Sequence, residues 1–261
     1  MPELPEVETL CRQMNALLPG QEVLRIDVSD SRLGKIDGWV GRRVAAVKRR
    51  GKYIRIDMSG GLTAEIHLRM SGRLLYRAAD DLPADIPYRR LAIHFSSGAL
   101  VLIDPRRFAT VTLQPQGIEP AIPDDPMESL PARRLLEVAR ERRLPVKSFL
   151  MDQRLIAGIG NIYACEILFA ARIDPRRPAG SLTMAEWRKV GKAAAMILRR
   201  AVACRGTTVS DWRDLFGRSG TNQERLEVYS RQGEPCKHCG SIIERISQSG
   251  RGTWLCPSCQ K

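Results

Sequence analysis

The chain has 261 residues, 43% of them apolar and 27% charged, which describes a globular protein long enough for two ordinary domains. No apolar run approaches the roughly 18 residues of a membrane span, and the acidic N-terminus lacks the basic-then-apolar build of a secretory signal. We therefore expect a cytoplasmic protein without a membrane partner. The net charge of +13 favours an anionic partner, usually nucleic acid, although a GC-rich genome also raises arginine content.

The N-terminal part of the chain changes its apolar period once. From Val7 to Leu17 apolar residues recur at helical spacing, which predicts a helix that starts at Pro5 and stops at Pro19-Gly20. Between Glu22 and Leu113 the period becomes two, in short runs such as Tyr53 to Met58. This pattern predicts an antiparallel sandwich or a flattened barrel.

Five prolines between Gln114 and Pro131 interrupt any regular element, so we expect a linker there. Beyond the linker the apolar pattern is helical to about residue 204. Helices are predicted over residues 132–142, 161–171 and 184–203.

The first residues combine an unusual amine with several carboxylates. Removal of Met1 would expose the secondary α-amine of Pro2, and an α-amine titrates near about pH 8, so part of it is the free base at neutral pH. Such an amine is a nucleophile towards a sugar carbon, and Glu3, Glu6 and Glu8 are candidate acids and bases. Taken alone, these first residues are better explained as the start of a helix, where Pro5 fits the first turn and acidic side chains favour the positive end of the helix dipole.

The C-terminal segment carries the most specific motif. Cys236-Lys-His-Cys239 and Cys256-Pro-Ser-Cys259 are two CxxC pairs separated by 16 residues. This spacing predicts a four-thiolate zinc site on two knuckles, because each tight turn supplies two ligands. Two disulfides are the alternative, which a reducing compartment disfavours. His238 is not expected to be a ligand.

Three further stretches combine basic, aromatic and glycine residues. Arg49 to Tyr53 places a basic cluster before a strand, and Asp104 to Phe108 places two arginines beside an aromatic side chain that can enter a duplex. Met70 is a second candidate wedge. Ile156 to Tyr163 is a glycine-rich loop that opens a helix at Asn161 and can face an anion. Each stretch also has an ordinary explanation when it is considered alone. These explanations are a solvated basic strand end, side-chain packing and a glycine-rich loop before a helix, which is common.

Taken together, these stretches resemble formamidopyrimidine-DNA glycosylases, in the order of that family and over nearly the whole chain. The matching stretches are Met1 to Thr9, Arg49 to Tyr53, His67 to Gly72, Asp104 to Phe108, Leu150 to Gln153, Gly158 to Tyr163 and the four cysteines.

The resemblance implies an α+β fold. It comprises an N-terminal antiparallel β-sandwich lobe with an N-terminal helix, a C-terminal helical lobe of the helix–two-turn–helix type, and a zinc-finger β-hairpin. The implied domains are a catalytic lobe over 1–113, the proline-rich linker over 114–131, the helix–two-turn–helix domain over 132–232 with a lesion-capping loop at about 207–229, and the zinc finger over 233–261.

The resemblance further implies a bifunctional glycosylase and abasic-site lyase of base-excision repair, which removes 8-oxoguanine and formamidopyrimidines from duplex DNA. Pro2 would attack C1′, expel the base and drive β,δ-elimination through a Schiff base. Glu3 would be the general acid at the deoxyribose, and Glu6 would orient the amine. Lys52 and Arg251 complete the expected catalytic set, with Lys52 near the lesion and Arg251 on a phosphate.

The residues expected to contact DNA are His67, Met70, Arg106, Phe108, Lys147, Asn161 and Tyr229. Met70, Arg106 and Phe108 match the side chains that fill the gap left by an everted base, because a base must leave the stack before its sugar can react. The others match positions near the lesion or its phosphates. One structural Zn²⁺, a damaged DNA duplex and a monomeric state are implied.

The chain departs from the family at two positions. Ala109 follows the wedge phenylalanine, where the family often has glycine. The capping loop reads Gly220-Thr221-Asn222, where an aromatic often follows the glycine, so that Asn222 replaces an expected aromatic. Leu4 favours the formamidopyrimidine branch over the endonuclease VIII branch, whose members act on oxidised pyrimidines. A non-catalytic zinc-dependent protein that binds damaged DNA is another alternative, but such a protein has no need of Pro2 followed by Glu3.

Overall fold

The computed structural model describes residues 1–34, 36–83, 85–117 and 124–261. Residues 118–123 of the expected linker lie outside this described part. The chain divides into two compact units, and each unit is built from two separated stretches. Unit 1 comprises Met1–Ala121 and Cys204–Thr221, and unit 2 comprises Ile122–Ala203 and Asn222–Lys261. The domains expected from the sequence, over 1–113, 132–232 and 233–261 with a linker over 114–131, remain a proposal.

Helix α1 (Leu4–Leu17) confirms the helix predicted near the N-terminus. Pro5 lies in its first turn, where a missing backbone N–H costs nothing. Glu3 and Glu6 close this end with a capping box, in which each side chain accepts the backbone N–H of the other residue. The helix ends before Gly20, whose φ of 84° turns the chain away.

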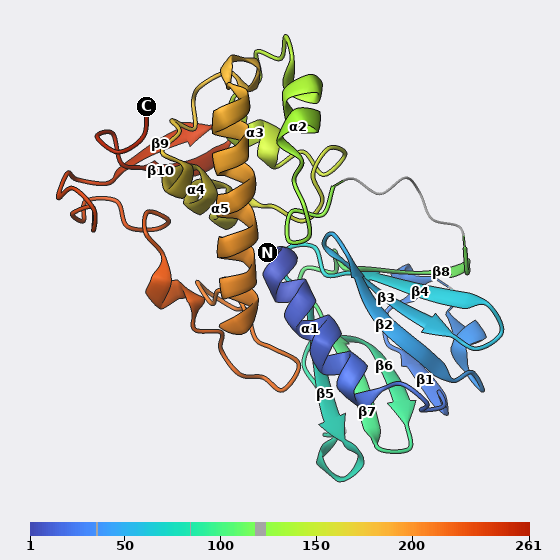
Figure 1. The fold of residues 1–261 in the computed structure, drawn as a ribbon. Helices are drawn as coiled ribbons and strands as arrows, with labels where there is room; N and C mark the ends of the chain where they lie inside the picture. Colours follow the sequence, from blue (N-terminus) through green and yellow to red (C-terminus); the bar gives the residue numbers. More distant parts are fainter. Residues whose placement is uncertain (35, 84, 118–123) are drawn as a thin grey trace. The chain divides into compact units, whose positions relative to one another are not determined.

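The described residues of unit 1 form two four-stranded antiparallel sheets (Figure 1). Their strand orders are β2-β3-β4-β8 and β1-β6-β7-β5. The strands are β1 (Arg25–Val28), β2 (Val44–Arg50), β3 (Tyr53–Met58), β4 (Leu62–His67), β5 (Arg73–Ala78), β6 (Arg89–Phe95), β7 (Gly98–Ile103) and β8 (Thr110–Pro115). Short 3-10 helices of the same unit are η1 (Ser31–Leu33), η2 (Asp37–Trp39) and η3 (Ala79–Asp81). Buried side chains of both sheets and of α1 form one apolar core, so the predicted antiparallel sandwich is confirmed.

Strand register brings three of the sequence motifs to one end of a sheet. Tyr53 of β3 lies opposite His67 of β4, and His67 lies opposite Thr110 of β8. The turn at Gly51-Lys52 therefore lies at the same end as His67 and the stretch Asp104 to Phe108, although these residues are far apart in the sequence.

Unit 2 contains four helices, a β-hairpin and two 3-10 helices within the part of the chain that the structure describes. They are α2 (Ala132–Ala139), α3 (Val146–Leu150), α4 (Asn161–Ala171), α5 (Met184–Ala203), β9 (Glu244–Gln248), β10 (Arg251–Leu255), η4 (Ala179–Ser181) and η5 (Asn222–Arg225). The predicted limits of α4 and α5 are confirmed. Helix α2 ends three residues before the predicted limit, because Arg140 leaves the helical conformation with a ψ of 132° and Glu141 adopts a φ of 63°. Helix α3 was not predicted, since five residues are too few for an apolar period.

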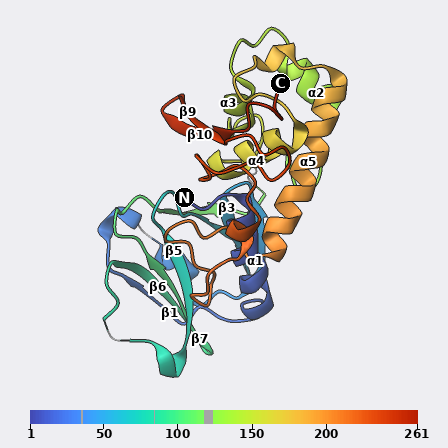
Figure 2. The same cartoon turned by 90° about the vertical axis from the view of Figure 1, so that its left-hand side faces the viewer.

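Helix α4 is the centre of unit 2. It packs against α5 and β10, as Figures 1 and 2 show. Most of its side chains are buried, as expected of a helix that is apolar around its circumference. Across the described residues, none of the helices has both the length and the apolar character needed to cross a membrane.

Candidate active site and nucleic-acid contact residues

Three of the predicted catalytic residues lie at the start of α1: Pro2 precedes the helix, Glu3 is its N-cap and Glu6 is in its first turn. Pro2 is buried, whereas Met1 is 52% exposed, and Glu3 and Glu6 are each 2% exposed. The Glu3 backbone N–H donates to Glu6 Oε2 at 2.9 Å. The Glu3 carboxylate accepts the Glu6 N–H in return. This reciprocal pair fixes both carboxylates within one turn of Pro2.

The other carboxylate oxygen of Glu6 joins α1 to the segment Cys204–Thr221. Glu6 Oε1 accepts the backbone N–H of Thr207 at 2.7 Å. Farther along the segment, Asp214 Oδ2 accepts a hydrogen bond from the Gln13 side chain of α1 at 2.9 Å. Sequence reasoning missed Thr207 and Asp214, because contacts between residues about two hundred positions apart leave no local motif.

Glu8, the third acidic residue of this region, forms ion pairs. Its carboxylate lies 2.7 Å from Arg12 Nε and 2.8 Å from Arg49 Nε. Burial alone would raise the pKa of Glu8, but the two guanidinium groups hold that pKa below its ordinary value. Glu8 is therefore ionised at neutral pH and is no proton donor.

Lys52 and His67 lie at the end of the sheet where β3 begins and β4 ends, and they are 7% and 8% exposed. Burial, followed by the charges of Arg69 and Lys52, lowers the pKa of His67 to about 4, so its ring is neutral at pH 7. The Arg69 backbone N–H donates to His67 Nδ1 at 2.9 Å, which places the ring proton on Nε2. A neutral N–H donor of this kind can bond a phosphate oxygen.

The predicted wedge side chains lie on the surface of unit 1. Met70 is 55% exposed and Phe108 is 45% exposed. The guanidinium carbon of Arg106 lies 4.6 Å from the centroid of the Phe108 ring, within the range of a cation–π contact. The neighbouring Arg107 instead forms an ion pair with the buried Asp30. The two arginines of this stretch therefore have different contacts.

A buried aspartate holds the turn that carries Phe108. Asp104 is 1% exposed; its Oδ1 accepts the Ser71 hydroxyl at 2.6 Å, and its Oδ2 accepts the backbone N–H groups of Phe108 and Ala109, both at 2.7 Å. Burial would raise the pKa of Asp104, but these hydrogen bonds lower it below its ordinary value. Ala109 does not adopt a positive φ, so alanine fits where the family often has glycine.

Lys147, Asn161 and Arg251 meet at the strand β10. Lys147 Nζ donates to Thr253 Oγ1 at 2.7 Å and to the Gly252 carbonyl at 3.1 Å, and Asn161 Nδ2 donates to the same carbonyl at 3.0 Å. Lys147 is only 1% exposed, so in this structure it ties α3 to the hairpin. Arg251, the residue before Gly252, is exposed.

The glycine-rich loop before α4 is braced by one side chain. Gln153 Oε1 accepts the Gly158 N–H at 2.9 Å, and Gln153 Nε2 donates to the Ile159 carbonyl at 2.7 Å. The helix then begins after Gly160, which supplies no side-chain cap. This loop geometry positions Asn161 at the positive end of the α4 dipole.

Tyr229 is positioned by a glutamate that sequence reasoning missed. Glu166 lies on α4 and is 1% exposed. Its carboxylate accepts the backbone N–H groups of Glu227, Val228 and Tyr229 at 2.9, 3.0 and 2.9 Å. Burial raises the pKa of Glu166 in spite of these bonds. A single acidic residue within an otherwise apolar helix was the signal that could have revealed it.

Asn222 does not face solvent. It is fully buried at the start of η5, and the preceding Thr221 N–H donates to the Cys204 carbonyl at 2.8 Å. Within the segment Cys204–Thr221, Phe216 is a large aromatic side chain with 41% exposure.

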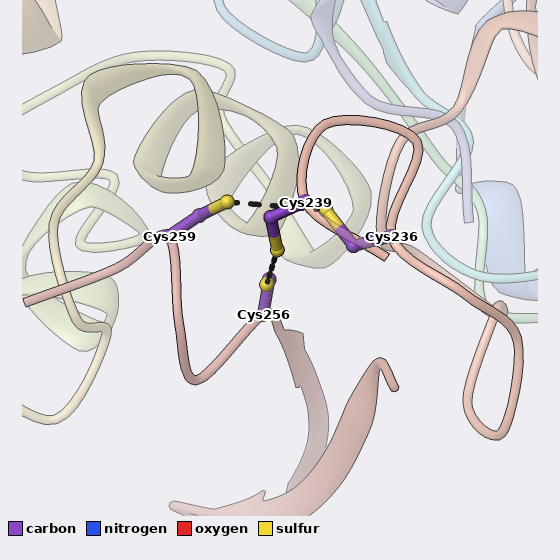
Figure 3. Close-up of side chains that lie close together, drawn as sticks. All are labelled: Cys236, Cys239, Cys256 and Cys259. Carbon is purple, nitrogen blue, oxygen red and sulfur yellow. Dashed lines mark hydrogen bonds between the residues drawn. The ribbon is translucent and has the colours of Figure 1, made fainter. Parts of the chain in front are cut away.

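The cysteine thiols of the C-terminal hairpin converge on one point (Figure 3). They belong to Cys236, Cys239, Cys256 and Cys259, and their Sγ atoms lie within 4.8 Å of one another. Sulfurs bound at about 2.3 Å to one tetrahedral zinc ion are separated by about 3.8 Å. The Cys236–Cys259 separation of 3.9 Å and the Cys239–Cys256 separation of 3.4 Å fit such an ion. The His238 ring packs against Phe169 instead.

Three family models match the chain in succession. Residues 1–111 match the formamidopyrimidine-DNA glycosylase N-terminal domain, residues 119–212 match the H2TH domain of that glycosylase, and residues 233–261 match a zinc finger found in FPG and IleRS. The last match and the thiol geometry together confirm the predicted four-cysteine zinc site.

Full-length relatives agree with these models. The formamidopyrimidine-DNA glycosylase of Desulforamulus reducens is 41% identical, with 100% of this chain and 99% of the relative covered. That of Gluconobacter oxydans is 38% identical over 100% of both chains. The Lactococcus lactis Fpg in complex with abasic-site DNA is similar in structure, with a TM-score of 0.91, 30% identity and 99% of each chain covered.

One unit has two sheets and a helix that begins beside Pro2 and two buried glutamates, and the other is helical and ends in a four-cysteine hairpin. With the matching family models, these features define the class of zinc-finger DNA glycosylases. Within this class, the chain belongs to the formamidopyrimidine-DNA glycosylase family. The predicted family and α+β fold are therefore confirmed.

Proposed function

We propose that this chain is a bifunctional glycosylase and abasic-site lyase that removes 8-oxoguanine and formamidopyrimidines from duplex DNA. The observation that carries the proposal is the buried pair of carboxylates, Glu3 and Glu6, joined across the first turn of α1 directly after Pro2. A protein that only binds DNA has no need of two buried acids beside its N-terminal amine.

In the glycosylase step, removal of Met1 leaves the nitrogen of Pro2 as a secondary amine with a pKa of about 8. The nitrogen forms a bond to C1′, the bond between C1′ and the base breaks, and the amine proton leaves with the base. Glu3 donates a proton to the deoxyribose ring oxygen as the ring opens. Glu6 orients the amine through the Glu3 backbone.

In the lyase step, the positively charged iminium between Pro2 and C1′ withdraws electrons from C2′. Loss of a C2′ proton then breaks the bond to the 3′-phosphate, and a second elimination releases the 5′-phosphate. The enzyme returns to the free amine when water hydrolyses the remaining imine.

Phosphate contacts are assigned to residues of both units. Lys52 and the neutral His67 supply donors in unit 1, and burial of Lys52 keeps its ammonium close to the sheet end. Asn161, Tyr229 and Arg251 supply donors in unit 2. Lys147 supports the hairpin on which Arg251 lies. We propose that one protein monomer makes all these contacts.

The vacancy left by an everted base is assigned to Met70, Arg106 and Phe108. The exposure of Met70 and Phe108 supports this assignment, because large apolar side chains gain free energy when they leave water. The fixed turn at Asp104 supports it further, since a wedge has to be rigid to hold bases apart.

The test is borohydride trapping of the enzyme–DNA imine on abasic and 8-oxoguanine duplexes. The processed protein should be trapped, whereas a protein with an N-terminal extension before Pro2 should bind the duplex and give no trapped band. The same extension placed at the C-terminus is the matched control. Trapping by the N-terminally extended protein would show that another amine, such as that of Lys52, carries the reaction.

Substrate class is tested by single-turnover excision of 8-oxoguanine, formamidopyrimidine and thymine glycol. Fastest excision of thymine glycol would favour the oxidised-pyrimidine alternative. Absence of excision and trapping on every duplex, with binding retained, would favour the non-catalytic alternative.

A further inference from the structure

We propose that Gly206 is a positioning residue for the reaction assigned to Pro2, and that it acts through Glu6. The inference rests on the proposed function, because it concerns the orientation of the same amine. Gly206 brings no side chain to the substrate. Its role follows from the space that a side chain at this position would occupy.

The place of Glu6 decides how the N-terminus is held. Glu6 accepts the Glu3 N–H at 2.9 Å with one oxygen and the Thr207 N–H at 2.7 Å with the other. With 2% exposure, this carboxylate has little access to water that would replace either bond. Rotation of the Glu6 side chain would release the backbone of Glu3 and, with it, the adjoining Pro2.

The backbone of Gly206 lies directly against the Glu6 side chain. A Cβ at residue 206 would lie 2.8 Å from Glu6 Oε1 and 2.9 Å from Glu6 Cγ, distances that non-bonded Cβ atoms essentially never show. The same Cβ would lie 3.0 Å from Trp212 Nε1. Gly206 also has a φ of 81°, which disfavours any residue with a side chain.

Gly206 is also packed against another glycine of its own segment. A Cβ at Gly220 would lie 2.2 Å from the Gly206 carbonyl oxygen, so the two backbones are already in contact. Trp212 Nε1 donates to the Arg205 carbonyl at 3.0 Å, which holds the indole in place. A side chain at residue 206 is therefore accommodated by displacement of Glu6.

The experiment compares Gly206→Ala with Gly20→Ala. Gly20 also lies in unit 1 and has a φ of 84°, but a Cβ there would meet no atom of the described residues within 4 Å beyond its own chain neighbours. The control therefore carries the backbone strain without the contact. For each full-length processed protein, the rate of borohydride trapping is measured at saturating enzyme on an abasic duplex. Kd is measured on a duplex with a tetrahydrofuran site, which has no C1′ leaving group.

We expect Gly206→Ala to lower the trapping rate by roughly tenfold or more, because small displacements of reacting groups have large effects on rate. Its Kd should stay within about twofold of the wild-type value, since affinity comes largely from phosphate contacts. Gly20→Ala should keep both quantities near wild type. Thermal unfolding of each variant shows whether the fold is retained.

A double-mutant cycle tests whether Gly206 acts through Glu6. In a Glu6→Ala background there is no carboxylate to displace, so Gly206→Ala should cause no further loss of rate. An equal further loss would overturn the inference, as would a wild-type trapping rate in Gly206→Ala or a rise in Kd that matches the loss of rate. Failure of the wild-type protein to be trapped would overturn the proposed function itself.

Discussion

The buried carboxylate of Asp104 accepts the backbone N–H of Phe108 at 2.7 Å, while the Phe108 ring remains 45% exposed. The buried Asp104 carboxylate thus fixes the backbone from which the exposed Phe108 ring projects. Hydrogen bonds to an ionised acceptor are stronger than those between neutral groups, which makes the turn rigid.

Asp104→Ala should loosen this turn and weaken binding to a duplex with a tetrahydrofuran site by roughly tenfold, because several buried N–H groups lose their acceptor. The free energy of unfolding should fall by about 2–4 kcal/mol. Urea unfolding and a binding titration measure the two effects. Asp104→Asn keeps one acceptor oxygen, so its stability and its affinity for the duplex should lie between those of the wild type and Asp104→Ala. If Asp104→Ala binds the duplex as tightly as the wild type, the turn does not support DNA binding.

His67 should make stability depend on pH. Its pKa is lowered from 6.5 to about 4 in the folded protein, so the unfolded chain takes up the proton first as the pH falls. The contribution of the neutral ring is complete above pH 6.5 and is lost progressively between pH 6.5 and about 4. Urea unfolding at pH 7.5 and at pH 4.5 should therefore show a larger loss of stability for the wild type than for His67→Gln. Equal losses would mean that His67 is not buried in its neutral form.

Glu166→Ala should destabilise unit 2, because the N–H groups of Glu227, Val228 and Tyr229 would be left without this acceptor. We expect a loss of about 3–5 kcal/mol in the free energy of unfolding, together with weaker DNA binding as Tyr229 moves. Glu166→Gln, which keeps the length and one carbonyl acceptor, is the matched control. Hydrogen exchange of the 227–229 amides measures the local effect, and unchanged protection in Glu166→Ala would contradict it.

Removal of zinc should abolish DNA binding and leave unit 1 folded, because a small hairpin buries too little apolar surface to fold without its metal. Loss of the hairpin also removes the Gly252 carbonyl that holds Lys147 and Asn161. Metal analysis and a DNA-binding assay with chelator test the loss of binding. Hydrogen exchange of strands β1 to β8 tests whether unit 1 stays folded. Cys204→Ser, outside the four-cysteine cluster, is the control, and zinc-free protein that still binds DNA would refute it.

Arg106→Ala should reduce the preference for cytosine opposite 8-oxoguanine. The arginine fork can donate to the O2 and N3 acceptors of cytosine, whereas adenine presents an amino donor at its pairing edge. A base contact of this kind is worth about 1–3 kcal/mol, so the ratio of excision rates opposite cytosine and adenine should fall by roughly tenfold. Single-turnover excision measures the ratio. If the wild type shows no such ratio, Arg106 does not read the opposite base.

Several features of this protein were readable from the sequence because their causes are local. The two CxxC pairs place their ligands on tight turns, and this spacing alone predicts a zinc site. The apolar periods of α1 and α5 follow from the helix face that must be buried, and α4 is apolar around its circumference, so the three helices were predictable from the sequence. The resemblance supplied the family, because its motifs occur in order along the chain.

Only the tertiary structure decided the hydrogen-bond partners and the burial of several charged side chains, because those partners are distant in the sequence. The sequence identifies Glu6 only as an acidic residue at the start of a helix, and the structure shows that it also accepts the Thr207 N–H. The sequence gives Glu166 no partner, and the structure shows that its carboxylate accepts N–H groups of the segment 227–229. Lys147 was expected to contact DNA, and the structure shows it buried against Thr253 of β10. Burial and hydrogen bonding depend on which segments share a volume, and a local pattern of residue types does not specify those neighbours.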